Sequence, residues 1–160
     1  MLETLRQQVD SAFARALAAQ PRAFACRAGC RRCCHADLTL FGVEADRVAA
    51  ALARLPTVTR QAAARRAERG EHCALLSPRS GRCLVYEERP IVCRAFGLAT
   101  LFEGVVTWCP LNFSDEAPRR DLVLELDPVN QALRKLERGS SPSGQDERHV
   151  RLSELARRGA

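Results

Sequence analysis

Length, composition and charge already exclude several classes of protein. The chain has 160 residues, of which 46% are hydrophobic and 28% charged, so it can bury one core and is not disordered as a whole. The net charge is +6, but all but one of the 25 basic residues are arginine, and only 5% of the residues are aromatic. This composition indicates a codon bias rather than a basic binding face, and we expect no nucleic-acid partner.

The chain lacks the sequence features of secreted and membrane proteins. No stretch approaches the roughly 18 apolar residues of a transmembrane helix. The N-terminal residues mix acidic and basic side chains and lack the apolar core of a signal peptide. We therefore expect a cytoplasmic protein with no membrane association. Thiols stay reduced in the cytoplasm, so the eight cysteines indicate metal binding rather than disulfide bonds.

The N-terminal half of the chain predicts helices around one short β-prone segment. Apolar residues recur at helical spacing in residues 2–17, and Pro21 ends this helix. Residues 37–42 are β-prone, and residues 43–55 predict a second helix that stops before the next proline. The basic residues 59–70 predict an exposed helix whose charges form a solvated face.

The centre of the chain predicts two hairpins. Residues 72–97 contain two short apolar runs around a turn at 77–81, followed by a short helix or turn. Residues 98–110 predict a second hairpin. These segments carry the four later cysteines, which are Cys73, Cys83, Cys93 and Cys109.

The C-terminal part predicts one more helix and then a tail. Asp127 and Pro128 are a favourable N-cap and first helical residue for a helix that runs to about Arg138. Residues 139–160 predict a flexible polar C-terminal tail, in which only a frayed helix forms. We therefore predict a single domain over residues 1–138 with an α+β fold. Its small, irregular, cysteine-rich metal-binding centre contains short hairpins and packs against N- and C-terminal helices.

Four cysteines fall within nine residues in CRAGCRRCC, residues 26–34. Cys30 and Cys33 have the chelate spacing in which one turn points two sulfurs at one ion, and Cys26 can reach the same ion. Adjacent side chains diverge, so Cys33 and Cys34 on one mononuclear ion would strain the backbone. Either one of them serves a second site, or the target is a cluster or a pair of ions. Eight thiols are also twice the four that a closed zinc or iron–sulfur site uses.

Arginines and histidines beside the cysteines are further candidates. Nearby cations lower the pKa of a thiol and offset the charge of thiolates, although codon bias explains any single arginine equally well. The arginines within a few residues of a cysteine are Arg27, Arg31, Arg32, Arg82 and Arg94. His35 and His72 adjoin cysteines and could supply nitrogen ligands. With so many thiols at hand, we expect hydrogen-bonding or surface roles for both histidines.

The cysteine pattern resembles the YkgJ-like cysteine-cluster family, a zinc- or iron-chelating domain. That family has a C-x(2,3)-C-x-x-C-C run, a C-x-x-L…G-x-C-x-x-Y-x-x-R-P-x-x-C-R segment and a late W-C-P. The order, the spacing and the residues other than cysteine agree over residues 22–113. The matching residues are Cys26, Cys30, Cys33, Cys34, Cys73, Leu76, Gly81, Cys83, Tyr86, Arg89, Pro90, Cys93, Arg94, Trp108, Cys109 and Pro110.

The resemblance implies a metal-binding protein in which the eight cysteines chelate zinc or iron, with an iron–sulfur cluster among the candidates. A similar cysteine arrangement occurs in flagellin lysine N-methylases, which are associated with an iron–sulfur cluster in methyl transfer. This chain has no recognisable S-adenosylmethionine site. Two alternatives stay open: an iron–sulfur-dependent enzyme, and an interaction module with structural zinc whose basic residues 59–70 dock an acidic partner protein.

Overall fold

The computed structural model divides the chain into two compact units, which we describe separately. Unit 1 comprises Met1–Arg27 and Ile91–Leu136, and unit 2 comprises Ala28–Pro90 and Glu137–Ala160. None of the helices within the described residues has the length and apolar character that a membrane crossing requires. The structure describes residues 1–27, 29–34, 36–70, 72–140 and 146–160.

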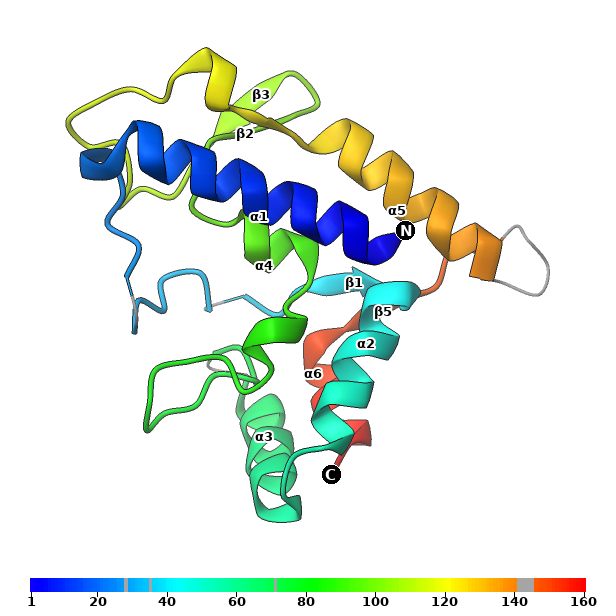
Figure 1. The fold of residues 1–160 in the computed structure, drawn as a ribbon. Helices are drawn as coiled ribbons and strands as arrows, with labels where there is room; N and C mark the ends of the chain where they lie inside the picture. The colour runs from blue at the N-terminus through cyan, green and yellow to red at the C-terminus, as the bar shows by residue number, and fades with distance from the viewer. Residues whose placement is uncertain (28, 35, 71, 141–145) are drawn as a thin grey trace. The chain divides into compact units, whose positions relative to one another are not determined.

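Unit 1 combines a long helix with a small sheet. Its elements are α1 (Leu2–Ala19), the 3₁₀ helix η1 (Pro21–Ala23), α4 (Ile91–Ala95), β2 (Thr100–Phe102), β3 (Val105–Thr107), the 3₁₀ helix η3 (Arg120–Leu122), β4 (Leu124–Glu125) and α5 (Leu126–Ser140), whose last residues belong to unit 2. α4 lies against α1 (Figure 1). β2 pairs antiparallel with β3 and parallel with β4, which gives the order β3-β2-β4. The predicted hairpin at 98–110 is confirmed as β2 and β3.

Helix α1 buries part of the face that its apolar spacing predicts. Leu5 and Val9 are buried on this face, whereas Leu17, at its far end, is exposed. After the helix ends, the buried side chain of Gln20 links two backbone positions of a later loop. Its Nε2 donates to the carbonyl of Ala117 at 3.0 Å, and its Oε1 accepts from the backbone N–H of Arg119 at 3.0 Å. One buried amide therefore fixes the turn after α1, because both of its polar atoms have partners.

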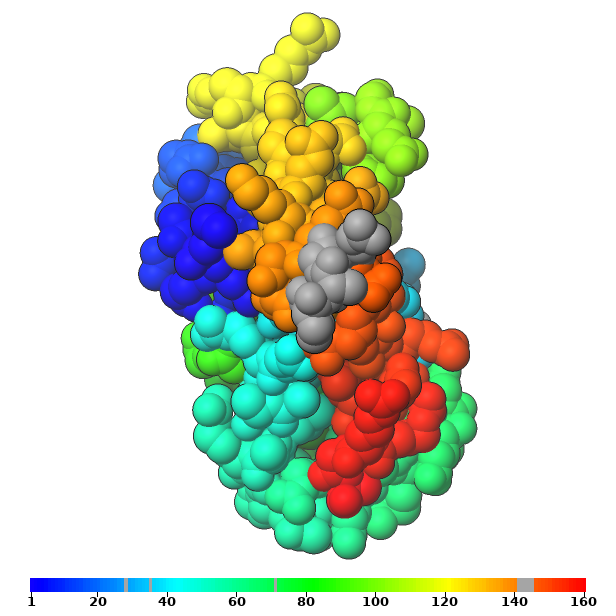
Figure 2. Space-filling model, turned by 90° about the vertical axis from the view of Figure 1, so that its right-hand side faces the viewer, coloured from blue at the N-terminus to red at the C-terminus, as the bar shows by residue number. Residues whose placement is uncertain are grey.

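Unit 2 packs three helices around one short strand pair. Its elements are β1 (Thr39–Phe41), α2 (Gly42–Ala53), α3 (Thr57–Arg69), the 3₁₀ helix η2 (Tyr86–Glu88), β5 (His149–Arg151) and α6 (Leu152–Arg158). β1 and β5 are antiparallel, with Leu40 opposite Val150. In Figure 2, α6 (red) lies between α2 (cyan) and α3 (green), and it contacts both. The helices and strands confirm the predicted α+β fold class.

Helix α3 differs from the exposed helix that its basic composition predicted. Ala63, Ala64 and Ala67 are buried, so one face of α3 packs inward, while Arg65 and Arg69 are exposed. Small alanine side chains let the neighbouring helix approach closely. A search for large apolar residues underestimates the burial of such a face, because each alanine contributes little hydrophobicity. The helix ends at Gly70, whose φ of 66° is the left-handed conformation typical of helix C-termini.

The C-terminal residues differ from the predicted flexible polar tail. Val150, Leu152 and Leu155 are buried in the core of unit 2, and β5 is paired with β1. The segment is mostly polar, and this composition led to the prediction of a tail although its few apolar residues all fall on the inward face. Residues 141–145 of the predicted linker lie outside the described residues. That residues 1–138 form a single, independently folding domain stays a prediction.

Candidate metal centre

The two units divide the eight cysteines between them. All eight cysteines are free thiols in the structure. Unit 2 holds Cys30, Cys33, Cys34, Cys73 and Cys83, and unit 1 holds Cys26, Cys93 and Cys109. His35 lies outside the described residues, and His72 is exposed. The thiols of each unit are described in turn.

Cys33 and Cys34 lie in a tight turn of unit 2. The backbone N–H of Cys34 donates to the carbonyl of Arg31 at 2.9 Å, and its own carbonyl accepts from Cys73 N–H at 2.9 Å. The Cys34 thiol donates a hydrogen bond to the Cys33 sulfur, which lowers the pKa of Cys33 to about 6 and raises that of Cys34. The expected divergence of adjacent sulfurs is therefore wrong here, because rotation about the Cα–Cβ bonds brings two short side chains together.

Cys73 and Cys83 lie on the two sides of the predicted hairpin at 72–97. This hairpin contains an isolated bridge between Leu76 and Cys83, and Leu84 N–H donates to Leu75 carbonyl at 2.8 Å. The two segments therefore run antiparallel without forming extended strands. Each presents its sulfur to backbone N–H groups that follow it in the chain.

Backbone donors and burial act in opposite directions on these two thiols. Burial raises the pKa of Cys73, and hydrogen bonds from the N–H groups of Leu75 and Leu76 oppose this shift. Burial likewise raises the pKa of Cys83 to about 11, against a hydrogen bond from the Val85 N–H. The N–H groups favour the thiolate, which is the form that binds metal. Donors two or three residues after each cysteine thus prepare the sulfur as a ligand.

The four sulfurs of Cys33, Cys34, Cys73 and Cys83 also act on one another. Burial is the largest cause of the raised pKa of Cys73 and of Cys83. Negative charge on Cys33 makes a smaller contribution that raises both values further. The pKa of Cys34 is raised first by its hydrogen bond to Cys33 and then by burial. Negative charge on Cys33, Cys73 and Cys83 raises this pKa further. Charge within the set thus disfavours the thiolates of Cys34, Cys73 and Cys83, and a bound cation stabilises such thiolates. We call the four thiols the unit 2 thiol set.

Besides Arg66, which interacts with Cys73, Arg89 is a positive charge that acts on the unit 2 thiol set. It lowers the pKa of Cys33 and of Cys83, as a lesser contribution than the hydrogen bonds and burial described above. Its guanidinium carbon lies 3.7 Å from the centre of the Tyr86 ring, and its Nε donates to the Tyr86 carbonyl at 3.1 Å. Arg94, by contrast, forms an ion pair with Asp10 within unit 1. The sequence pointed to Arg94 as a neighbour of the thiols and missed Arg89.

Cys30 is exposed and lies beside the hairpin turn. A Cβ on Gly81, whose φ is 65°, would lie 3.5 Å from the carbonyl oxygen of Gly29, the residue before Cys30. The turn at 77–81 therefore passes close to the Cys30 segment. The positive φ of Gly81 accounts for a glycine there, since a side chain in this conformation is strained.

In unit 1, the buried Asn112 connects the segments that carry the three cysteines. Its Nδ2 donates to the Cys26 sulfur at 3.3 Å and to the Gly97 carbonyl at 2.7 Å, and its backbone N–H donates to the Cys109 carbonyl at 2.9 Å. Cys93 lies in α4, one turn before Gly97. Sequence reasoning missed Asn112, whose only signal was a lone amide between Leu111 and Phe113.

The donor set fits zinc or iron in its chemistry. Thiolates are the ligands that zinc and iron–sulfur sites use, and the unit 2 thiol set supplies four of them with backbone donors. Within the described ranges, no three His, Cys, Asp or Glu side chains already converge as a group that could hold an ion. Binding would therefore require the four sulfurs to close on the ion.

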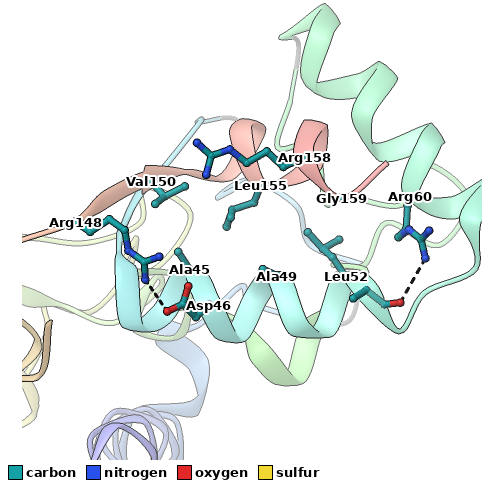
Figure 3. A pocket seen from close by; sticks show the side chains of 11 residues that line it. Ala45, Asp46, Ala49, Leu52, Arg60, Arg148, Val150, Leu155, Arg158 and Gly159 are labelled. Carbon is teal, nitrogen blue, oxygen red and sulfur yellow. Dashed lines mark hydrogen bonds and ion pairs between the residues drawn. The ribbon is translucent and has the colours of Figure 1, made fainter. Parts of the chain in front are cut away.

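A pocket of about 450 Å³ in unit 2 is separate from these thiols. It lies over α2 and α6, with Ala45, Leu52 and Leu155 among its lining (Figure 3). Arg148 at its rim pairs with Asp46 at 2.6 Å. Arg60 and Arg158, also in the lining, bind backbone carbonyls at the end of α2 and Glu154 respectively. Since its arginines are engaged by neighbouring groups and no cysteine lines it, we do not assign this pocket a function.

Comparison with known proteins agrees with the site. The family model CxxCxxCC, described as "Putative zinc- or iron-chelating domain", matches residues 25–110 and so covers more than half of the chain. No curated protein and no solved structure matches the chain. All eight cysteines lie within the matched residues. The chain therefore belongs to the CxxCxxCC family of zinc- or iron-chelating domains, and its role is to bind metal.

Proposed function

We propose that the unit 2 thiol set, Cys33, Cys34, Cys73 and Cys83, forms a tetrathiolate centre for zinc or iron. The observation that carries this proposal is the backbone hydrogen bond from the Cys73 N–H to the Cys34 carbonyl at 2.9 Å, which joins the turn of Cys33 and Cys34 to the hairpin of Cys73 and Cys83. Charge on neighbouring thiols, which raises the pKa of Cys34, Cys73 and Cys83, supports it. A tetrahedral set of four sulfurs suits zinc or an iron–sulfur centre. Cysteines that bind metal must stay reduced, so we propose that the protein is cytoplasmic.

The centre is proposed to be structural. Cys73 and Cys83 are half-buried and pack against the core of unit 2, whose buried members include Leu75 and Val85. A cation there would relieve the repulsion between thiolates and join the turn at 31–34 to the hairpin. The free energy of metal binding would then contribute to folding of unit 2, as in small metal-stabilised domains.

The chain's own residues have distinct tasks in this centre. The N–H groups of Leu75, Leu76 and Val85 hold the sulfurs as acceptors. Arg89 offsets part of the negative charge that four thiolates carry. When bound, the metal supplies the positive charge that the protein lacks among these sulfurs. Cys26, Cys93 and Cys109 form a second set of metal-binding thiols in the proposal, since four sulfurs satisfy one closed site.

Purification of the full chain under anaerobic conditions tests the proposal. Metal analysis, sulfide analysis and an optical spectrum distinguish the two metals. Colourless protein with stoichiometric zinc indicates a zinc centre, and broad visible absorbance with iron and sulfide indicates an iron–sulfur cluster. A fully folded protein that contains neither metal, and that takes up neither on reconstitution, would contradict the proposed function.

A further inference from the structure

Asn112 has an unusual position in unit 1, because it is buried and its side-chain amide joins two separate segments. Its side chain is 1% exposed. Its Oδ1 accepts from the backbone N–H of Ala25 at 2.9 Å, next to Cys26. Its Nδ2 donates to Gly97, which follows α4 and Cys93. The residue thus gathers chain segments that are up to 87 positions apart in sequence.

The hydrogen bonds of the Asn112 amide indicate that the Cys26 sulfur is a hydrogen-bond acceptor. An asparagine side chain has two N–H donors and one carbonyl acceptor. One donor is used by Gly97, and the other points at the sulfur at 3.3 Å. The sulfur also lies 3.7 Å from Oδ1, which already accepts from Ala25. The shorter contact is the one in which the sulfur accepts, and a thiolate is the better acceptor.

Gly97 leaves room for the sulfur at this place. Its φ is 109°, and a Cβ added there would lie 2.9 Å from the Cys26 sulfur and 3.3 Å from Phe13. Any side chain at position 97 would therefore collide with the sulfur or displace it. Gly97 leaves the space for the Cys26 sulfur, and the Asn112 amide donates a hydrogen bond to it, so the two residues together fix the position of this atom. A cysteine that only packs against its neighbours would require neither feature.

We propose that Asn112 is a positioning residue for metal binding by Cys26: it holds the sulfur as a hydrogen-bond acceptor in the orientation in which it meets the ion. This inference rests on the proposed function for the thiols. Cys26 is exposed, so the sulfur held from its buried side by Asn112 remains open to an incoming cation. Amide donors to a metal-bound sulfur act as outer-shell partners, whose loss lowers metal affinity by about 10- to 100-fold.

Asn112→Asp in the full chain is the direct test. The substitution keeps the size of the side chain and the acceptor to Ala25, but it replaces the Nδ2 that donates to the sulfur and to the Gly97 carbonyl with a carboxylate oxygen. We expect zinc affinity, measured by competition with a chromophoric chelator, to fall about 10- to 100-fold. Gln20→Glu is the matched control, since Gln20 is a buried amide of the same unit that bridges two backbone groups. It should alter thermal stability and leave zinc affinity unchanged.

A double-mutant cycle separates positioning from general structural damage. In a Cys26→Ala background, Asn112→Asp should change zinc affinity by less than about twofold, because the sulfur on which it acts is gone. Equal losses in both backgrounds, or no loss in either, would overturn the positioning role while leaving the proposed function intact. Failure of the unaltered chain to bind zinc or iron would overturn the proposed function, and the positioning role with it.

A second measurement needs no change at the buried position. In the zinc-loaded chain, one side-chain N–H resonance of Asn112 should shift on Cys26→Ala, because its acceptor is removed. Cys30→Ala, which alters an exposed cysteine of unit 2, should leave it in place. Identical Asn112 resonances in the unaltered chain and the Cys26→Ala variant would overturn the inference even if Asn112→Asp failed to fold.

Discussion

The two units prepare their thiols in different ways. In unit 2, the sulfurs of Cys73 and Cys83 receive hydrogen bonds from backbone N–H groups two or three residues further on. In unit 1, the Cys26 sulfur receives its hydrogen bond from a side chain 86 positions away. Local spacing thus builds the first arrangement, while the second exists only after unit 1 has folded. Unit 2 should therefore depend on metal to order itself, whereas unit 1 should order its sulfur without metal.

Burial strengthens this contrast. Cys73 and Cys83 pack against a core that includes Leu75 and Val85, so metal and core are contiguous in unit 2. Cys26, by contrast, is exposed, although Phe24 and Phe113 pack close to it in the chain with a ring separation of 5.1 Å. Metal loss should consequently disturb the packing of unit 2 more than that of unit 1.

Removal of metal should produce the largest effect. A strong chelator should lower the melting temperature of the full chain by more than about 10 °C, since binding free energy at a structural site is also folding free energy. Hydrogen exchange should show protection lost mainly in residues 72–90 of unit 2 and retained in α1. A Cys73→Ser, Cys83→Ser variant serves as the control, because the chelator should cause no further loss of protection in its residues 72–90. Protection lost equally in both units would contradict the contrast between them.

Replacement of single cysteines should sharpen the definition of the unit 2 thiol set. Cys34→Ser should lower the metal content as much as Cys33→Ser, because the two sulfurs face each other in one turn. Cys30→Ser should retain more metal, since Cys30 is not one of the four thiols of the unit 2 thiol set. Metal content per chain, measured after identical purification, gives the comparison. Full retention of metal in Cys34→Ser would remove Cys34 from the ligand set.

These residues also show what the sequence could and could not predict. The cysteine spacing predicted metal binding, and apolar periodicity predicted α1 and α2. The contact between the sulfurs of Cys33 and Cys34 was not predictable from backbone geometry, because it depends on the side-chain rotamers. Asn112 was missed because its contacts join residues far apart in sequence. Arg89 was missed because proximity in the sequence favoured Arg94, which pairs with Asp10 instead.

The core of unit 2 can be weakened without altering a thiol. Leu152 at the start of α6 is 2% exposed, so Leu152→Ala should destabilise the chain by about 3 kcal/mol through lost burial and a residual cavity. Val58→Ala, at an exposed position of α3, should change stability by less than about 0.5 kcal/mol. Chemical denaturation of the metal-loaded chain gives both values. A negligible effect of Leu152→Ala would restore the prediction of a flexible tail over residues 139–160.

Arg89→Gln should give the smallest effect, and it tests the charge balance of unit 2 alone. The pKa of Cys33 is lowered to about 6, first by the hydrogen bond from Cys34 and in lesser part by Arg89. Loss of a positive charge disfavours the thiolate, so the pKa of Cys33 should rise in the variant. In metal-free protein, the alkylation rate of Cys33 falls as the pH drops through this pKa, because the thiolate is the nucleophile.

The variant should accordingly shift the midpoint of that pH profile upward and slow alkylation at pH 6 by a few fold, as expected for a minor contribution to the pKa. Arg79→Gln is the matched control, since Arg79 is exposed in the same hairpin and does not act on Cys33. Cys26 in unit 1 should react at an unchanged rate in both variants, because Asn112 rather than Arg89 prepares its sulfur. If Arg89→Gln left the Cys33 profile where it was, the hydrogen bond from Cys34 alone would account for the reactive thiolate. Unit 2 would then resemble unit 1 in relying on a neutral donor, and the charge on Arg89 would serve only its contact with Tyr86.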